Sequence, residues 1–543
     1  MRVEDVLGRL AVMAELPNMK TSCLLAAGLG FALVAWRFWC ALFKTNQLEP
    51  PVLRSYVPFI GHLWGLMRHA HDYLTSLHLQ NPLPVCSLPM LGRKVYVINN
   101  PILIQAAFTN TKLSFGPFVI DFVGRMDELS ASARRAYVEE GMHARVKQIF
   151  STHMTGQPLK KMNTVLLTQL MLHLPGNGSV VEVKSLWVWL RNILTVGSTS
   201  MLLGARNNPF RTDAALVEAY WKYEAGDPSR RYNVTAVGNR SSAKNHAAML
   251  KALTAYFSAG HDLSQHPEDA DIAQMTRETT GMQREWGFTD TDLAAAQIVI
   301  IHATLVSAVP TIIWAVAHVF SRPELLATLR EEALNAVTIK SDDEDPGSAK
   351  HVLVTAERIE PRCPTLVAVF RETQRLAAVG TLHRRVLEDT MISGNIEGKE
   401  VSYSLKKGVA VLMPVVPSHR NTETWGEGVD DFQPERFLSE EKIDTKGASQ
   451  LRKKAYFPFG GGRELCPGRN FATAETLSTL VVLILGFDIH ARDGSTFRLP
   501  PVGPSKMTSQ TARPLETADM AARIKRREGW ENVVWGVSTT STM

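Results

Sequence analysis

Near its C-terminal end the chain reads Phe459-Gly460-Gly461-Gly462-Arg463-Glu464-Leu465-Cys466-Pro467-Gly468, and this segment decides the fold. Pro467 suits the first position of a helix, because proline lacks the N–H that would be unpaired there. Cys466 is then expected beside the amides and the positive dipole of a helix start, which favour thiolate over thiol. Such a thiolate is a nucleophile or a metal ligand. Three glycines that let the backbone lie flat against a planar partner favour the ligand.

The same segment resembles the cysteine loop of a known family. Its pattern Phe-x-x-Gly-x-x-x-Cys-x-Gly is similar to the haem-binding loop of the cytochrome P450 family, in which a cysteine thiolate is the axial ligand of the haem iron. The resemblance implies that Cys466 ligates the iron of haem b and that the loop contacts the haem. The residues that match the pattern are Phe459, Gly462, Cys466 and Gly468. On this segment alone, the alternative is a glycine-rich turn around a buried, inert cysteine.

Two further motifs precede the loop in the order in which the family has them. Glu372 and Arg375 lie three residues apart, on one face of a helix expected over residues 365–376. Arg436 follows in the run Pro-Glu-Arg-Phe. The resemblance implies that these three charges form a buried salt-bridge cluster beneath the haem, and losing one member would be strongly destabilising. Solvent-exposed helix charges are the alternative interpretation.

The carboxylates of a haem need cationic partners, and two arginines are candidates. Arg384 begins a segment similar to the family's Arg-x-Val-x-x-Asp, in which the arginine pairs with a haem propionate, and a planar guanidinium suits a carboxylate. Two places before the cysteine the family usually has Arg or His, but this chain has Glu464, with Arg463 one place earlier. A carboxylate there would repel a propionate. Either Arg463 turns inward, or the propionate is held elsewhere.

A long buried helix is predicted over residues 289–320. Thr289 and Asp292 form a capping-box start, and Arg322-Pro323 ends the helix. Nearly all residues from 293 to 320 are apolar or small, so the helix should be buried on most faces.

This helix resembles the one that crosses the oxygen-binding side of the haem in the family, where an acid and a threonine relay protons. Counting back from Trp314 places Val306 at the acid position and Ser307 at the threonine position, which leaves Ser307 as the candidate proton relay. Pro310 has no N–H, so the Val306 carbonyl loses its helical partner and a kink is expected beside Ser307. The run from Val306 to Trp314 resembles the branch of sterol 7α-hydroxylases and prostacyclin synthase, which contains both oxygenases and an isomerase.

The resemblance implies a monooxygenase that takes electrons from NADPH through a flavoprotein reductase. The candidate substrate-pocket residues are His302, Ala303, Val306, Val379 and Leu382. They are largely small or apolar, so a bulky apolar substrate is expected: a terpenoid, steroid or polyketide-like molecule in fungal secondary-metabolite biosynthesis. One alternative is a haem-thiolate isomerase or dehydratase that needs no reductase. Another is a haem-binding sensor without turnover.

The composition of the 543 residues, 45% hydrophobic and 21% charged, is that of a globular protein. We expect a mainly helical fold with a small clustered β region at residues 390–413. The predicted organisation is a tail (1–20), a transmembrane anchor (21–43), a proline-containing linker (44–60) and one large haem-binding catalytic domain (61–543). The 23 residues of the anchor suffice to span a bilayer, although a cleaved signal peptide is the alternative. We expect an endoplasmic-reticulum membrane protein with its catalytic domain in the cytoplasm.

Charge and cysteine content narrow the possible partners. A net charge of +6 is mild and does not indicate nucleic acid. Five scattered cysteines are too few for a disulfide framework. The run Arg452-Lys453-Lys454 lies close to the cysteine loop, where a basic patch would suit an acidic flavoprotein. A solvated cluster of charges explains it equally well.

Overall fold

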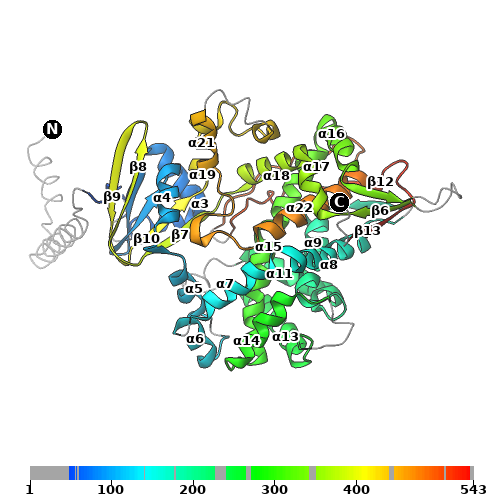
Figure 1. Ribbon diagram of the computed structural model, residues 1–543, viewed down its shortest axis with the longest axis horizontal. Coiled ribbons are helices and arrows are strands. Elements are labelled where there is room, and N and C mark those ends of the chain that lie inside the picture. Colours follow the sequence, from blue (N-terminus) through cyan, green and yellow to red (C-terminus); the bar gives the residue numbers. More distant parts are fainter. Residues whose placement is uncertain are drawn as a thin grey trace, which may run out of the picture.

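Helix α15 (Asp290–Phe320) crosses the middle of the computed structural model (Figure 1). The Thr289 hydroxyl accepts a hydrogen bond from the Asp292 amide at 3.2 Å, and the Asp292 carboxylate accepts one from the Thr289 amide at 2.9 Å. The same carboxylate accepts bonds from Ser130, the N-cap of α6 (Ala131–Val138), so one acid holds two helix starts together. The predicted capping box and long helix are both confirmed.

The structure describes residues 48–538 except 56, 58–59, 127, 140, 177–178, 227–239, 264–270, 341–349, 439–445 and 507–508. The predicted tail and anchor lie outside these ranges. As expected, most of the described chain is helical. Besides α6 and α15, the helices are α3 (Leu63–Gln80), α4 (Pro101–Thr109), α5 (Gly116–Val123), α7 (Met142–His153), α8 (Gly156–Leu172), α9 (Leu186–Leu203), α10 (Pro209–Thr212), α11 (Ala214–Gly226), α13 (Arg240–Ser258), α14 (Gln274–Glu285), α16 (Pro323–Leu334), α17 (Ala356–Arg362), α18 (Pro364–Ala377), α19 (Val416–His419), α20 (Thr422–Trp425), α21 (Lys446–Ala455), α22 (Arg469–Gly486) and the 3₁₀ helices η2 (Pro434–Phe437) and η3 (Gly462–Glu464).

In the part of the chain that the structure describes, the strands form four small sheets. One sheet has the order β1 (Val85–Met90), β2 (Arg93–Ile98), β10 (Ala410–Pro414), β7 (Thr381–Val386), β3 (Leu113–Ser114), and another is the hairpin of β8 (Thr390–Ile396) and β9 (Lys399–Leu405). The other two are β11 (Phe487–Ala491), β12 (Ala522–Arg526), β4 (Val180–Val183), and β13 (Val533–Val537), β6 (Lys350–Val354), β5 (Val337–Lys340). Strands β7 to β10 lie at one side of Figure 1, while β6, β12 and β13 lie at the other. The predicted β-rich stretch is confirmed, but strands also form on the far side, where the sequence predicted none.

Strand β10 lies inside the five-stranded sheet. It runs parallel to β2 and antiparallel to β7, so Val411 is paired with Tyr96 on one side and Arg384 on the other. Strand β7 is itself flanked by β3 on its far side. Arg384 is therefore carried by a strand that neighbours hold on both edges, which restricts where its side chain can reach.

Part of the predicted linker is tied to the sheet. The Ser87 amide on β1 donates to the Pro51 carbonyl at 2.8 Å, and the Ser87 hydroxyl donates to the Pro50 carbonyl at 2.9 Å. Glu49 forms an ion pair with Lys94 on β2. The described residues of the linker are thus joined to the five-stranded sheet by hydrogen bonds and an ion pair.

The main apolar core surrounds α15, which packs against α9, α13, α18 and α22. Within the described residues α15 is long and apolar enough to cross a membrane, but most of it is covered by these neighbours, as expected of a core helix. A second apolar cluster fills the space between the five-stranded sheet and α4. Pro310 lies inside α15, which continues as one helix to Phe320.

Candidate functional site

The cysteine loop, residues 459–468, is closed by its own backbone. The Cys466 amide donates to the Phe459 carbonyl at 3.0 Å, and the Gly460 amide donates to the Phe457 carbonyl at 3.0 Å. Inside the loop, the Leu465 amide donates to the Gly462 carbonyl at 3.2 Å. These bonds satisfy polar groups that would otherwise need water, so the loop holds Cys466 in a defined place.

The glycines of the loop are required by helix α4. A Cβ on Gly461 would lie 2.2 Å from the Phe108 ring, and a Cβ on Gly462 would lie 1.9 Å from the Phe108 carbonyl oxygen. Gly462 also has φ +62°, a left-handed conformation that other residues adopt with strain. The glycines therefore allow a close approach to α4, and the planar partner inferred from the sequence stays a prediction.

The helix after the cysteine begins later than predicted. Gly468 is the N-cap of α22, and the Ala472 amide donates to its carbonyl at 2.9 Å. The prediction that Pro467 occupies the first helical position is wrong by two residues, because Pro467 lies in the turn before this first hydrogen bond. Cys466 consequently lies just outside the helix, with the first amides of α22 beside it.

Cys466 is half-buried, and this partial burial raises the pKa of its thiol. Hydrogen bonds from the Gly468 and Arg469 amides, together with the charge of Arg469, oppose this rise without overcoming it. The amides converge on the sulfur as expected from the sequence. Their field alone does not make a thiolate, which then depends on a bound metal cation.

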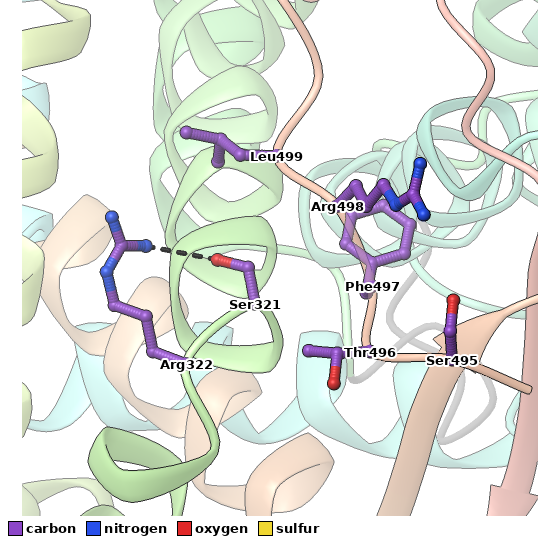
Figure 2. A pocket seen from close by; sticks show the side chains of 7 residues that line it. All are labelled: Ser321, Arg322, Ser495, Thr496, Phe497, Arg498 and Leu499. Carbon is purple, nitrogen blue, oxygen red and sulfur yellow. Dashed lines mark hydrogen bonds between the residues drawn. The ribbon is translucent and has the colours of Figure 1, made fainter.

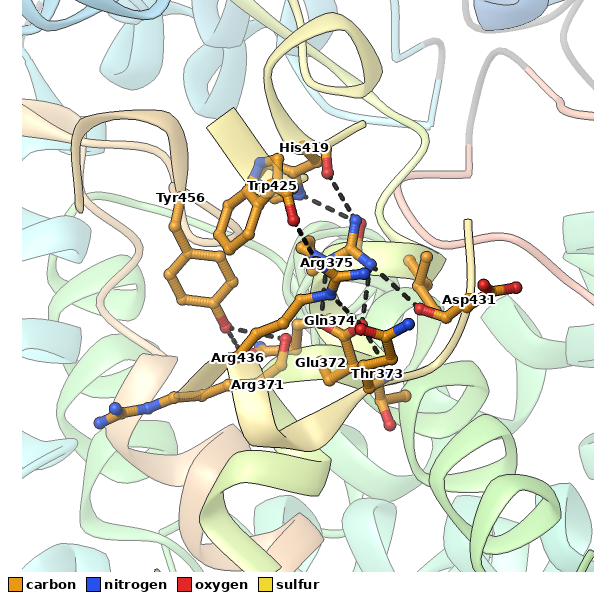
Figure 3. Close-up of polar contacts among 12 residues, drawn as sticks. Arg371, Glu372, Thr373, Gln374, Arg375, His419, Trp425, Asp431, Arg436 and Tyr456 are labelled. Atoms are coloured by element: carbon orange, nitrogen blue, oxygen red, sulfur yellow. Dashed lines mark hydrogen bonds and ion pairs between the residues drawn. The ribbon is translucent and has the colours of Figure 1, made fainter. Parts of the chain in front are cut away.

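Behind the loop lies the cluster of Glu372, Arg375 and Arg436 (Figure 3). The Arg375 guanidinium donates to both Glu372 oxygens, at 2.7 and 2.8 Å, and the side chains of both residues are fully buried. Arg436 Nε lies 3.5 Å from Glu372 Oε1. The Gln433 amide donates to the same oxygen at 3.0 Å. The structure therefore brings together the three charges that the sequence predicted, and the alternative of solvent-exposed helix charges is wrong.

His419 connects this cluster to the cysteine loop, a role that the sequence did not reveal. Its Nε2 accepts a hydrogen bond from the Phe457 amide at 3.2 Å, so its Nδ1 carries the proton that bonds the Arg375 carbonyl at 3.3 Å. The Arg375 guanidinium donates to the His419 carbonyl at 2.8 Å. Burial lowers the pKa of His419 to about 3, which keeps the ring neutral and this arrangement intact. The partners of His419 lie 38 and 44 residues away in the sequence, so local spacing carried no signal for these contacts.

Arg384 reaches the loop from β7. Its side chain is buried and donates to the Gly461 carbonyl at 3.3 Å and to the His383 carbonyl at 2.8 Å. Burial lowers the pKa of Arg384, and the nearby charge of Glu464 opposes this change. Arg463, by contrast, has an exposed side chain. Of the two candidate cations, Arg384 is the one that lies against the loop interior.

Glu464 has a partner that the sequence did not indicate. Lys147 of α7 donates to its carboxylate at 2.6 Å and to the Arg463 carbonyl at 2.7 Å. Partial burial raises the pKa of Glu464. This rise is outweighed by the hydrogen bond and charge of Lys147, the charge of Arg384 and the Phe115 amide, so the pKa lies below its usual value. Glu464 is therefore a compensated carboxylate. Finding Lys147 required the packing of α7 on the loop, which lies 317 residues away in sequence.

One stretch of α15 is accessible although the flanking turns are buried. Ala303 is exposed, and His302 and Ser307 are half-buried, whereas Val306 is buried. The Thr311 hydroxyl donates to the Ser307 carbonyl at 2.8 Å. Ala303 and Ser307 are four residues apart and share one helix face. The accessible face therefore carries the predicted relay hydroxyl and the predicted small pocket residue, and Val306, three residues after Ala303, is buried.

The remaining pocket candidates lie where α18 passes into β7. Val379 is half-buried, and its amide donates to the Gln510 carbonyl at 3.0 Å. The Leu382 side chain lies 3.8 Å from the position of a Cβ on Gly460, against the cysteine loop. On α15, the Nδ1 of His302 lies 3.4 Å from the hydroxyl of Tyr220 on α11. Tyr220 was not a sequence candidate, because nothing local links it to α15.

The basic run before the loop lies on α21. Lys453 and Lys454 are exposed, while Arg452 is half-buried and donates to the Thr424 carbonyl at 2.9 Å. The arginine therefore stabilises the fold, and the two lysines lie on the surface.

Two surface pockets lie away from the cysteine. One, of about 610 Å³, is lined by Ser321, Arg322 and residues 495–499, and Figure 2 shows Arg322 bonded to the Ser321 hydroxyl at 3.0 Å. Ser321 follows Ser307 by 14 positions, about 20 Å along a helix. The other, of about 500 Å³, lies between α7 and α14. Neither contains a residue of the cysteine loop.

The donor set around Cys466 fits a metal held by a prosthetic group. Within the described residues, no three His, Cys, Asp or Glu side chains gather closely enough to hold a metal ion. A metal on Cys466 would thus need its other ligands from a bound molecule. The buried Arg384 guanidinium beside the loop suits the carboxylates that haem carries, and the residues present fit that cofactor.

Comparisons with known proteins agree with this arrangement. The family model named Cytochrome P450 matches residues 238–515. A cytochrome P450 monooxygenase from Gibberella zeae is 30% identical over 496 residues, 90% of this chain and 91% of the relative. Cytochrome P450 monooxygenase nodJ from Hypoxylon pulicicidum is 25% identical over 508 residues, 91% of this chain and 92% of the relative. The 5-beta-cholestane-3-alpha,7-alpha-diol 12-alpha-hydroxylase of Sus scrofa is 23% identical over 504 residues, 88% of this chain and 94% of the relative. The predicted likeness to fungal monooxygenases and sterol hydroxylases is confirmed.

Proposed function

The chain belongs to the cytochrome P450 family, and from that premise we propose that it inserts one oxygen atom from O2 into a bulky apolar substrate. Bound haem would supply the activation of O2 and the transfer of oxygen to carbon. Cys466 would ligate the iron as a thiolate and donate electron density to it. Phe459, Gly462 and Gly468 would shape the loop that holds this sulfur, and Arg384 would pair with a propionate.

The observation that carries this proposal is the convergence on Cys466. The half-buried Cys466 sulfur, with two amides directed at it, is held by a loop that an ion cluster supports from behind, and two members of this cluster, Glu372 and Arg375, are fully buried. Burying charged groups costs desolvation free energy, so such a cluster is stable only when every charged group has its partners. Glu372, Arg375 and Arg436 would therefore hold the loop in place without contacting the haem.

On the opposite side, α15 would face the reacting substrate. Ala303 leaves room beside the helix, and the Ser307 hydroxyl would act as the proton relay through its Oγ. Val379 and Leu382 would add apolar surface to the pocket. His302, which lies next to Tyr220, would lie at the edge of this surface. Val306, which is buried on the same helix, would contribute apolar surface to the pocket. A site with so few polar groups favours a terpenoid, steroid or polyketide-like substrate, and the fungal relatives favour a role in secondary metabolism.

Electrons would come from NADPH through a flavoprotein reductase. The exposed Lys453 and Lys454, close in sequence to the cysteine loop, would attract an acidic partner, and such steering weakens with salt. Residues 21–43 would anchor the chain in the endoplasmic-reticulum membrane, with the catalytic domain in the cytoplasm and the linker between them.

Product analysis with isotopically labelled O2 tests this function directly. The holoenzyme with reductase, NADPH and an apolar compound that shifts the haem spin state should yield a product that carries one labelled oxygen atom. Product formation without NADPH and O2 would contradict the proposal and favour the isomerase or dehydratase, which the replacement of the family's acid and threonine by Val306 and Ser307 also permits. A haem iron that no compound perturbs would favour the sensor.

A further inference from the structure

Glu464 places a negative charge where the family resemblance leads one to expect a base. It belongs to η3, two residues before Cys466, and its side chain is 22% exposed. A charge so placed would repel a haem propionate unless a cation compensated it. Its partner is Lys147, whose ammonium donates to the carboxylate at 2.6 Å.

The contacts of Glu464 join three elements that are remote in sequence. Lys147 comes from α7 and also donates to the Arg463 carbonyl at 2.7 Å, so it bonds the loop twice. The Phe115 amide, just before α5, bonds the same carboxylate. Arg384 of β7 is attracted electrostatically and bonds the loop at Gly461. The carboxylate therefore links the cysteine loop to α7 and to the start of α5.

The two cations near the loop, Lys147 and Arg384, have different hydrogen-bond partners. Lys147 donates to Glu464 and to the Arg463 carbonyl, whereas the hydrogen bonds that the Arg384 side chain makes within the described residues go to two neutral carbonyls, at 2.8 and 3.3 Å. Charge-assisted bonds are the stronger kind, so a carboxylate brought to Arg384 gains more there than at Lys147. A fixed negative charge near a redox centre also disfavours the arrival of an electron.

We propose that Glu464 is a positioning residue of the haem site, which binds Lys147, leaves Arg384 as the propionate partner and lowers the reduction potential of the iron. This inference rests on the proposed haem-thiolate function and adds to it a specific role for the acid in the loop. Glu464 touches neither the substrate nor the reacting atoms, and it acts through Lys147 and the charge it carries.

Three variants of the holoenzyme test the inference by redox titration and by the rate of haem transfer to apomyoglobin. Glu464→Gln keeps the shape and removes the charge, so the midpoint potential should move to more positive values. Lys147→Met leaves the Glu464 carboxylate uncompensated, so the midpoint potential should move to more negative values. Haem loss should accelerate roughly tenfold, which corresponds to the free energy of one charge-assisted hydrogen bond. The double variant should return both quantities toward those of the wild type.

Glu388→Gln is the matched control. Glu388 lies just after β7 and pairs with Lys112 on the surface at 3.4 Å, so this variant makes the same change of charge away from the loop and should leave the potential unchanged. The inference is overturned if Glu464→Gln behaves like this control, or if the double variant loses haem as fast as Lys147→Met. Should Lys147→Met fail to fold by far-ultraviolet circular dichroism, the potential of Glu464→Gln alone decides. Failure of the wild type to form a thiolate-ligated haem would instead refute the proposed function.

Discussion

The two sides of the proposed haem site are built on different principles. On the cysteine side, charged and hydrogen-bonding groups from α7, β7, α18 and η2 are bonded to one another and to the loop. On the α15 side, Ala303 and Ser307 are accessible and Val306 is buried. Each polar group on the cysteine side is bonded to a specific partner, so the residues on this side indicate which cofactor is bound. The second side is mostly apolar surface, which many substrates and more than one reaction can use.

The largest effect is expected where the cysteine side is most buried. Arg375→Leu leaves the Glu372 carboxylate buried without its bidentate partner, which costs roughly 3–5 kcal/mol of unfolding free energy. Denaturant titration of the holoenzyme measures the loss. Lys406→Met, which breaks the exposed pair with Asp389, serves as the control and should change nothing measurable. Equal losses of unfolding free energy in the two variants would show that burial does not determine how much the cluster stabilises the protein.

The next effect concerns Glu475, which lies on α22 and accepts a bond from the Ser198 hydroxyl at 2.9 Å. Burial raises its pKa from 4.5 to about 8. The folded protein therefore holds a proton that the unfolded chain releases, and stability falls as pH rises between these two values. At neutral pH, keeping this carboxyl group protonated in the folded protein lowers the free energy of unfolding by about 3 kcal/mol.

Glu475→Gln should remove that dependence. The variant should gain unfolding free energy relative to the wild type at about pH 8 but not at about pH 4.5, because only the carboxyl group changes its charge in that interval. Chemical unfolding at the two pH values measures the difference. An equal effect of the substitution at both values would show that Glu475 does not titrate as its burial requires.

A smaller effect separates two glycines of the loop. Gly462→Ala places a methyl group against the Phe108 backbone at a left-handed φ, which should cost about 1–3 kcal/mol and displace the loop. Gly468→Ala puts its methyl group 3.6 Å from Met154 and 3.7 Å from the Cys466 sulfur, ordinary contact distances, and should be tolerated. Haem content and thermal unfolding distinguish the two variants. If both lose haem alike, the loop contacts the cofactor more closely than it contacts α4.

The smallest effect is expected on α15. Ser307→Ala should leave the reduced carbon-monoxide spectrum unchanged and should lower the product formed per NADPH by roughly tenfold at most, since water can replace one hydroxyl in a relay. Oxygen and NADPH consumption, compared with product, measure this coupling. Unchanged coupling would show that Ser307 does not deliver protons and that the α15 side contributes only shape.

The sequence revealed those parts of the site that depend on local spacing. Glu372 and Arg375 share a face because they are three residues apart, and the capping box at Thr289 needs only neighbouring residues. Lys147 and His419 were missed because their partners lie far away in the chain, and no local periodicity reports such contacts. The strands at the far side of the molecule were missed for the same reason: β12 pairs with β4, more than 300 residues earlier in the sequence.

One prediction needed correction although its local rule is valid. Pro467 is compatible with a helix start, yet the first helical hydrogen bond is made at Gly468. Two further contacts of the loop had no local signal in the sequence: Phe108 of α4 lies against Gly461 and Gly462, and Lys147 compensates the charge of Glu464.

The reduced carbon-monoxide difference spectrum of the purified protein tests the central claim most directly. With Cys466 as the thiolate ligand, the spectrum should show the red-shifted Soret band of haem-thiolate proteins, and Cys466→Ser should abolish it. A Soret band at the position of ordinary haem proteins in the wild type, or a red-shifted band that survives the substitution, would contradict the claim.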